Sequence, residues 1–157
     1  MRIFRLLIFL AFISCSVIDR GDYTHYEGFK VYMKGVHNID LEQNTSNQYY
    51  YLIMANEFCV CTKLNLENIK ENLQPLGKNL TVVLIGEVSE ELKQNYVNDL
   101  SRLVHIIYDE NREIYQYRTA IGKPIFIHTY GAQLEYGKIV NDPDVNLIAD
   151  YVTKIIK

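Results

Sequence analysis

The stretch Tyr49–Leu64, Y-Y-Y-L-I-M-A-N-E-F-C-V-C-T-K-L, joins an apolar run to a pair of cysteines. Tyr50–Met54 is continuously apolar, as expected for a strand that is buried on both faces of a sheet. Cys59 and Cys61 lie between this strand and a helical pattern, and the N-terminus of a helix favours an anion such as a thiolate. The pair is therefore a candidate thiol site. The alternative is that Cys61 is a small core residue and Cys59 a loop residue.

Strands and helices alternate after this stretch. Leu66, Ile69 and Leu73 repeat at intervals of three and four residues, which predicts one buried helical face. Leu80–Ile85 predicts a central strand, and Ser89 predicts the cap of the next helix. That helix is predicted to bury a face of Leu92, Tyr96, Leu100 and Leu103. A strand Val104–Tyr108, a short helix over 111–119 and a hairpin of Pro124–His128 and Leu134–Val140 are predicted to follow. The last predicted helix begins after Asp142-Pro143 and has the apolar stripe Val145, Ile148, Val152 and Ile155.

The part of the chain before Tyr49 predicts two short strands. Gly28 precedes Phe29–Met33, which alternates as a strand does, and Ile39–Leu41 is predicted to return as a second strand. From Tyr50 onward the predicted order is β-α-β-α-β, then a hairpin and a C-terminal helix. Alternation of this kind implies parallel strands with right-handed crossovers, and the hairpin adds antiparallel strands. The expected fold class is therefore α/β, with three layers around a central mixed sheet.

The N-terminus predicts an export signal. Met1–Ser14 has two arginines near its start and an apolar run from Leu6 to Ile13, which is shorter than the roughly 20 residues of a membrane-spanning helix. Phe12-Ile13-Ser14-Cys15 resembles a bacterial lipobox in the looser form seen in Bacteroidetes, and this resemblance implies lipid on Cys15. The alternative is an ordinary signal peptide with a chance cysteine.

The expected organisation is a lipoprotein signal peptide over 1–14, a lipidated cysteine and tether over 15–27, and one domain over 28–157. The expected location is the bacterial cell envelope, lipid-anchored and either facing the periplasm or on the outer membrane. The chain carries a formal net charge of −3 and no basic cluster, so no nucleic-acid partner is expected. No metal or other cofactor is expected, because C-x-C alone falls short of a closed four-ligand set.

Two segments resemble the thioredoxin fold, and more narrowly the TlpA/ResA-like and AhpC/TSA-type redoxins that bacteria export. They are Asn56–Cys61 (N-E-F-C-V-C) and Gly122–Gly131 (G-K-P-I-F-I-H-T-Y-G). The resemblance covers about Phe29 to Lys157 and implies a cis bond before Pro124, with Lys123 and Pro124 lying beside the cysteines as substrate-binding residues. The chain departs from the pattern because C-x-C replaces C-x-x-C and His128-Thr129 replaces the usual Asp region.

A thiol–disulfide reaction needs a thiolate that attacks and a second thiol that resolves the mixed disulfide. Residues at i and i+2 lie on nearly opposite sides of a helix, but in an extended segment they share a face with Cα atoms about 6.6 Å apart. That separation is near the upper end of the disulfide range of about 4.4–6.8 Å, so a Cys59–Cys61 bond would be strained and readily reduced. Cys61 is expected to be the more buried resolving cysteine, and Cys59 the nucleophile.

Three functions follow from these expectations. The first is a membrane-anchored thiol–disulfide oxidoreductase that uses Cys59 and Cys61 on protein thiol or disulfide partners. The second is a non-catalytic thioredoxin-fold lipoprotein that binds a protein or small ligand beside Pro124. The third is a peroxiredoxin-like peroxidase that uses Cys61, but Phe58 and Lys123 stand near the places where such an enzyme needs Thr and Arg.

Lipidation gives the first testable prediction. Cys15→Ser should release the protein from membranes, because the lipid is added to the sulfur of that cysteine. Membrane fractionation and intact mass measure the effect. Retention of the variant in the membrane fraction at unchanged mass would show that the anchor is not a lipid on Cys15.

Overall fold

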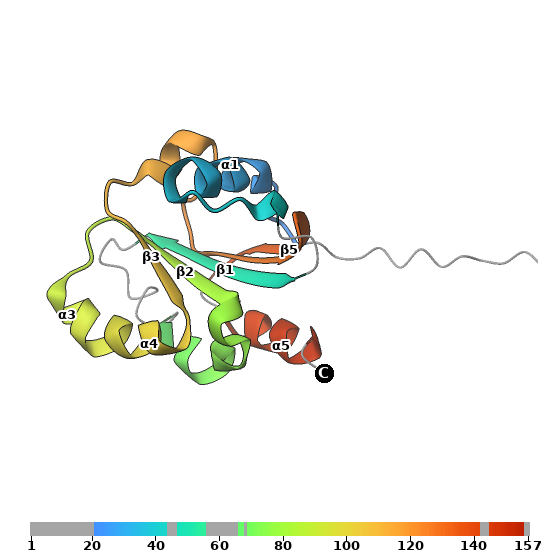
Figure 1. The fold of residues 1–157 in the computed structure, drawn as a ribbon. Coiled ribbons are helices and arrows are strands. Elements are labelled where there is room, and N and C mark those ends of the chain that lie inside the picture. The colour runs from blue at the N-terminus through green and yellow to red at the C-terminus, as the bar shows by residue number, and fades with distance from the viewer. Residues whose placement is uncertain (1–20, 44–46, 56–65, 68, 142–144, 156–157) are drawn as a thin grey trace, which may run out of the picture.

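A sheet lies between two layers of helices in the computed structural model, as Figure 1 shows, and the expected three-layer α/β arrangement is confirmed. The structure describes residues 21–43, 47–55, 66–67, 69–141 and 145–155. Its elements in chain order are α1 (Tyr26–His37), η1 (Leu41–Gln43), β1 (Gln48–Ala55), η2 (Ile69–Leu73), η3 (Gln74–Asn79), β2 (Leu80–Ile85), α3 (Glu90–Leu92), η4 (Lys93–Val97), α4 (Asn98–Leu103), β3 (His105–Asp109), η5 (Glu113–Tyr117), β4 (Ile125–Tyr130), β5 (Gln133–Ile139) and α5 (Val145–Ile155).

The sheet is mixed and has the strand order β3-β2-β1-β4-β5. β1 pairs in parallel with β2, from Tyr50 opposite Leu80 to Ala55 opposite Ile85, and β2 pairs in parallel with β3. β4 runs antiparallel to β1 on its other side, and β5 completes the hairpin. Strand β1 is therefore the centre of the sheet, and the strands predicted from Tyr50 onward are confirmed.

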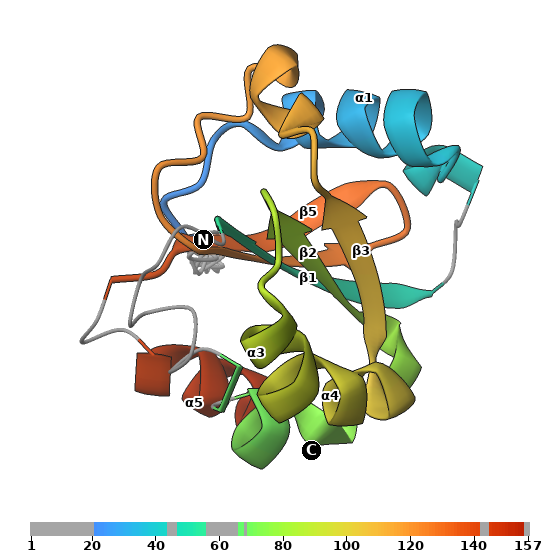
Figure 2. The ribbon, with the colours of Figure 1, turned by 90° about the vertical axis from the view of Figure 1, so that its left-hand side faces the viewer.

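The core has two halves, one on each face of the sheet (Figure 2). Successive side chains of a strand point to opposite faces. Tyr50, Leu52 and Met54 pack into a cluster with η2, α4 and α5, whereas Tyr51 and Ile53 pack into a second cluster with α1 and η5. The unbroken apolar run of β1 is thus explained by burial on both faces.

The predicted strand Phe29–Met33 is wrong, because this segment lies inside helix α1. The buried residues of α1 are Tyr26, Phe29, Tyr32 and Met33, which share one helical face. Gly28 sits within the helix, where a Cβ atom would overlap the carbonyl oxygen of Tyr117 on η5. The glycine that seemed to open a strand instead allows α1 to approach η5 closely.

The second predicted strand, Ile39–Leu41, is also wrong. Asn38 ends α1 in the left-handed conformation with φ of 54°, and the amide of Ile39 donates to the carbonyl oxygen of Met33 at 3.0 Å. The chain is therefore tied to the end of the helix, and Leu41 begins the short helix η1. Leu41 is buried in the cluster beneath α1, which explains its apolar character.

The tether expected over 15–27 ends sooner than predicted. Residues 21–23, here called the strap, lie along the outer edge of β5, where Gly21 pairs with Gly137 in parallel. The amide of Tyr23 donates to the carbonyl oxygen of Gly137 at 3.0 Å, and the carboxylate of Asp22 accepts from the amide of Ile139 at 2.7 Å. The packed domain therefore includes residues 21–27 as well as those from Gly28 onward.

Most other local predictions are confirmed. The Ser89 hydroxyl accepts a hydrogen bond from the amide of Leu92 at 3.2 Å, as a helix cap does. Leu66, Ile69 and Leu73 are buried on one face of the sheet together with Ile148 and Val152 of α5. The proposed helix start at Asp142-Pro143 lies outside the described residues.

The contact between α1 and η5 gives a prediction for stability. Gly28→Ala should lower the free energy of unfolding by about 1–3 kcal/mol, because the new methyl group meets backbone that has no room to shift. The steric cost of the methyl group should exceed the roughly 1 kcal/mol by which alanine is favoured over glycine inside a helix, so the variant is less stable. Urea unfolding measures the loss. Gly122→Ala is the matched control, since a Cβ there meets no atom within 4 Å, and equal stability of the two variants would refute the close approach.

Candidate functional site

The candidate site lies at one end of the sheet, here called the carboxyl edge. The parallel strands β1, β2 and β3 all end there, at Ala55, Ile85 and Asp109. β4 begins at the same edge, because Ile125 pairs with Ile53 near the end of β1. In open α/β sheets, ligands bind in the crevice outside the carboxyl ends of the strands.

The pairing of β4 with β1 places Lys123 and Pro124 at the carboxyl edge, beside the end of β1. Lys123 is exposed and donates from Nζ to the side-chain oxygen of Asn141 at 2.6 Å. Pro124 is half-buried, and its carbonyl oxygen accepts from the amide of Val140 at 2.7 Å. Cys59 and Cys61 lie outside the described residues.

The expected cis bond before Pro124 is wrong, because no cis peptide bond occurs in the described residues, which include Lys123 and Pro124. For a bond that precedes proline, the trans form is favoured by about 0.5–1 kcal/mol. The resemblance alone suggested the cis form, and the backbone here pairs with the end of β5 without it.

Asp109 is the buried charged residue at the carboxyl edge, with 4% of its surface exposed. Its carboxylate accepts from the amides of Glu113 at 2.8 Å and Ile114 at 2.9 Å, which are in the first turn of η5. Its carbonyl oxygen accepts from the amide of Gly86 at 2.9 Å, just beyond β2. Asp109 therefore joins the ends of two strands to the segment that leads to β4.

Tyr32 and His37 extend this network into α1. The charge of Asp109 acts on the hydroxyl of Tyr32, and Nε2 of His37 lies 2.8 Å from the same hydroxyl. Burial, and then the charge of Asp109, raise the pKa of Tyr32, while burial lowers the pKa of His37 against the charges of Asp109 and Glu113. The Asp109 carboxylate accepts hydrogen bonds from two backbone amides, so its role is to position neighbouring segments.

The segment between Asp109 and Pro124 has an unusual backbone. Arg112, Arg118 and Ala120 adopt left-handed conformations with φ between 51° and 58°, a region that L-residues seldom occupy. Arg112 precedes η5 and lies over Gly86, where a Cβ atom would be 3.4 Å from its Nε atom. This backbone brings a guanidinium to the carboxyl edge.

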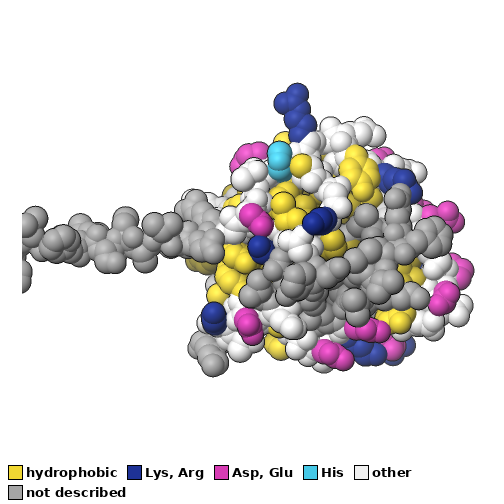
Figure 3. Space-filling model, turned by 180° about the vertical axis from the view of Figure 1, so that it is seen from behind, with side chains coloured by type: hydrophobic (Ala, Val, Ile, Leu, Met, Phe, Trp, Pro, Cys, Tyr) yellow, Lys and Arg dark blue, Asp and Glu magenta, His cyan; other side chains and the backbone are white. Residues whose placement is uncertain are grey.

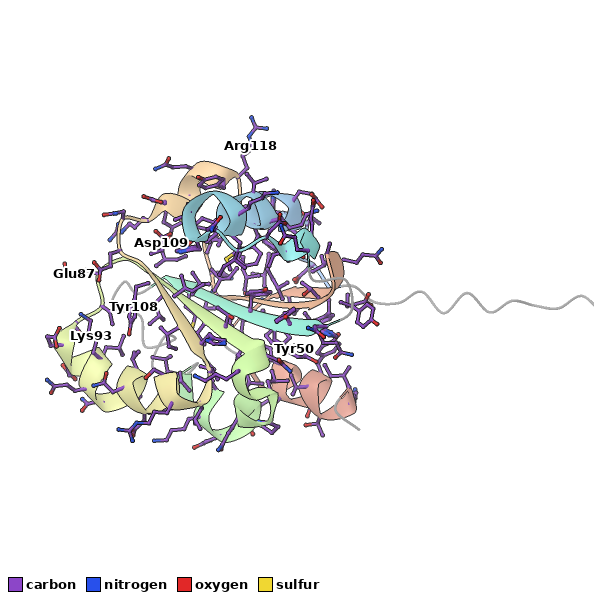
Figure 4. The ribbon with its side chains drawn as sticks, viewed as in Figure 1. Tyr50, Glu87, Lys93, Tyr108, Asp109 and Arg118 are labelled. Atoms are coloured by element: carbon purple, nitrogen blue, oxygen red, sulfur yellow. The ribbon has the colours of Figure 1, made fainter. Side chains whose placement is uncertain are left out.

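Side chains of both signs surround the site. Figure 4 shows Glu87 and Lys93 on the side of the molecule where β2 and β3 end, with Tyr108 nearby and Tyr50 toward the other end of β1. Acidic and basic side chains are interspersed on the face seen in Figure 3.

Within the described part of the chain, no group of three or more His, Cys, Asp or Glu side chains is placed to hold a metal ion. None of the helices described there is both long and apolar enough to cross a bilayer.

Sequence reasoning missed the network of Asp109, Tyr32 and His37. Asp109 directly follows an apolar strand and precedes a short helix, which is a recognisable pattern for a cap. Nothing in the local sequence pointed to Tyr32 or His37, because α1 was predicted to be a strand and the contact joins segments far apart in the chain.

Comparison with solved structures identifies the fold. No protein-family model matches the chain, and no curated protein matches it in sequence. The secreted Mycobacterium tuberculosis disulfide oxidoreductase homologous to Escherichia coli DsbE is 12% identical, with 74% of this chain and 87% of that chain covered and a TM-score of 0.52. StoA from Bacillus subtilis is 13% identical, with coverage of 69% and 84% and a TM-score of 0.50.

A putative thiol:disulfide interchange protein DsbE from Chlorobium tepidum is 10% identical, with coverage of 76% and 86% and a TM-score of 0.50. At these identities the likeness concerns the fold. The strand order, the mixed pairing and the two helical layers agree with it, and the chain has a thioredoxin-like α/β fold.

The hydrogen bonds of Asp109 give a prediction. Asp109→Asn should lower the free energy of unfolding by about 1–3 kcal/mol at neutral pH, because an amide group replaces an acceptor that faces backbone donors. Thermal or urea unfolding measures the loss. Asp99→Asn is the control, since the Asp99 side chain is 61% exposed and should change stability by less than about 0.5 kcal/mol. Similar losses for both variants would show that Asp109 does not anchor η5.

Proposed function

We propose that this chain is a thiol–disulfide oxidoreductase of the bacterial cell envelope, anchored through lipid on Cys15, with Cys59 and Cys61 as its reacting pair. Lys123 and Pro124 would form part of the surface that receives a protein thiol or disulfide. No cofactor is needed, because the electrons are exchanged between sulfur atoms.

The topology of the sheet is the observation that carries this proposal. β1 ends at Ala55, four residues before Cys59, and the start of β4 is paired beside the end of β1. Chain order and strand register thus bring the end of β1, after which the chain continues toward both cysteines, to the same edge as Pro124. The solved structures of similar fold are described as disulfide oxidoreductases or thiol:disulfide interchange proteins, which supports the same class of chemistry.

The charge at the carboxyl edge also supports thiol chemistry. Arg112 lies over Gly86, next to the end of β2, and β2 is the parallel neighbour of β1. A guanidinium near a cysteine lowers the thiol pKa and raises the fraction of reactive thiolate. This positive charge would assist whichever cysteine attacks.

The proposed reaction conserves sulfur bonds and electrons. The thiolate of Cys59 attacks one sulfur of a substrate disulfide, forming a mixed disulfide and releasing one substrate thiolate. The thiolate of Cys61 then attacks the sulfur of Cys59, forming the Cys59–Cys61 disulfide and releasing the second substrate thiolate. The substrate gains two electrons and the protein loses two; the reverse sequence oxidises a substrate dithiol.

The spacing of the cysteines favours a second candidate, a non-catalytic thioredoxin-fold lipoprotein that binds a ligand beside Pro124. C-x-C cannot place both sulfurs on one face of a helix. A redox titration of the mature protein in glutathione buffers, with thiols counted by mass spectrometry, separates the two candidates. A Cys59–Cys61 couple that exchanges with glutathione supports the oxidoreductase, and two inert thiols support the binding protein.

The division of roles between the cysteines gives a prediction. Cys61→Ser should trap a mixed disulfide with a model substrate on Cys59, because attack proceeds and resolution does not. Cys59→Ser is the matched control and should trap nothing. Non-reducing electrophoresis and mass spectrometry of the adduct measure the result.

Alkylation of the reduced, folded protein tests the same assignment independently. Cys59 should react with iodoacetamide faster than Cys61, as the more exposed thiol. Faster labelling of Cys61 would reverse the roles and support a peroxiredoxin-like reaction. If neither cysteine is labelled without denaturant, both are packing residues and the oxidoreductase proposal fails.

A further inference from the structure

A buried histidine lies outside the candidate site, in the middle of β4. His128 has 5% of its surface exposed and stands opposite Tyr50 of β1. Its Nδ1 atom is 2.7 Å from the hydroxyl of Tyr151 on α5, and its Nε2 atom has no hydrogen-bond partner among the described residues. A buried polar atom without a partner is uncommon and calls for a physical explanation.

Aromatic rings enclose this imidazole. The ring of Tyr50 is stacked on it at 4.5 Å between centroids, and the ring of Tyr151 meets it edge-on at 5.8 Å. Tyr151 in turn stacks on Tyr136 of β5 at 4.1 Å. The titratable side chains whose rings surround His128 among the described residues are therefore tyrosines, which are neutral at physiological pH. Glu135 and Lys138 of β5 and Asp150 and Lys154 of α5 are the charged residues of the same elements.

The environment of His128 favours the neutral imidazole. Burial lowers the pKa of His128 to about 4, with no compensating carboxylate. The negative charge of Glu135 acts on Tyr151, whose pKa burial and neighbouring groups raise to about 12. A protonated His128 would carry a charge in an apolar layer, with a donor on Nε2 that has no acceptor.

Water can reach His128 at least cost through movement of α5. β1 and β5 are joined to β4 by backbone ladders, the one to β5 with a register shift between His128 and Thr129, whereas α5 rests on the sheet through side chains. Its described side chains in the core cluster are Ile148 and Val152, which are buried, and Tyr151 and Ile155, which are partly buried. Separation of α5 would hydrate His128 and leave the sheet intact.

We propose that His128 and Tyr151 form an acid-operated latch, which holds α5 against the sheet while His128 is neutral and releases it when His128 is protonated. α5 belongs to the same core cluster as Leu66, Ile69 and Leu73, the helical face that follows the cysteine segment. Release of α5 removes part of the support of that face. The latch itself does not rest on the proposed function.

The direction of the pH effect follows from linkage. The folded pKa of His128 lies below the ordinary histidine value of about 6.5, so the closed state is fully favoured above that pH. In the closed state α5 is packed on the sheet, and in the open state it is separated from it. As pH falls from about 6.5 toward 4, His128 is protonated in the open state first, so the closed state is progressively disfavoured. From pH 7 to pH 4 the ratio of open to closed molecules should rise on the order of a hundredfold.

Hydrogen exchange of the full-length protein, corrected for the intrinsic pH dependence of exchange, tests the latch. Peptides that cover Val145–Ile155 should lose on the order of a hundredfold in protection between pH 7 and pH 4, while peptides that cover β2 keep theirs. His128→Asn replaces Nδ1 with an amide that does not titrate, so this loss should disappear. His105→Asn is the matched control, because His105 is exposed on β3, and the loss should remain.

Three results would overturn the proposal: protection of α5 that does not change with pH, simultaneous loss of protection in α5 and β2, or an ordinary pKa near 6.5 for His128 in an NMR titration of the wild-type protein. The NMR titration needs no variant, so it stands even if His128→Asn does not fold. None of these measurements involves a cysteine, so failure of the latch and failure of the oxidoreductase proposal are distinguishable.

Discussion

Burial of β1 on both faces is the constraint on which the rest of the structure depends. Every side chain from Tyr50 to Met54 is at most 4% exposed, so the strand needs a neighbour on each side and a layer of helices above and below. β2 and β4 satisfy its backbone groups. Each fully buried large side chain contributes about 1.5–3 kcal/mol to the free energy of unfolding. Because each helical layer buries a different set of β1 side chains, neither layer could replace the other.

The two layers are held to the sheet in different ways. On one face, Tyr32 of α1 lies under the influence of the charge of Asp109 at the carboxyl edge, and α1 touches η5 closely at Gly28. On the other face, α5 packs mainly through apolar and aromatic side chains, with Tyr151 and His128 as its polar link to the sheet. Helix α1 is therefore held by contacts that include backbone, and helix α5 by contacts between side chains.

Sequence patterns predicted the elements whose signal is local. β2 matches the predicted Leu80–Ile85, and the Ser89 cap forms as expected. The prediction of a strand over Phe29–Met33 was wrong because a short aromatic and β-branched run fits the period of a strand and that of a helix. The helical period is recognised only when Tyr26 is included. Gly28 strengthened the error, because its reason for being in a helix is a contact with η5, some ninety residues further along the chain.

The candidate site likewise contains residues that the sequence indicated and residues that it did not. The sequence pointed to Cys59, Cys61 and the segment before β4, and the strand register brings the end of β1 and the start of β4 to one edge. The sequence did not point to Asp109 as the anchor of that edge, because a single aspartate after a strand is common and its partners Tyr32 and His37 are distant. Hydrogen bonds between remote segments follow from the fold and cannot be found before the fold is known.

The direction of the strap relates the proposed anchor to the proposed site. Gly21 pairs with Gly137 in parallel, and β5 runs toward the carboxyl edge, where Ile139 pairs with Ile125. The strap runs in the same direction as β5, so it begins on the side of the sheet where β4 ends at Tyr130, opposite to the carboxyl edge. The strap therefore runs from that end of the sheet toward the carboxyl edge, where Lys123 and Pro124 lie.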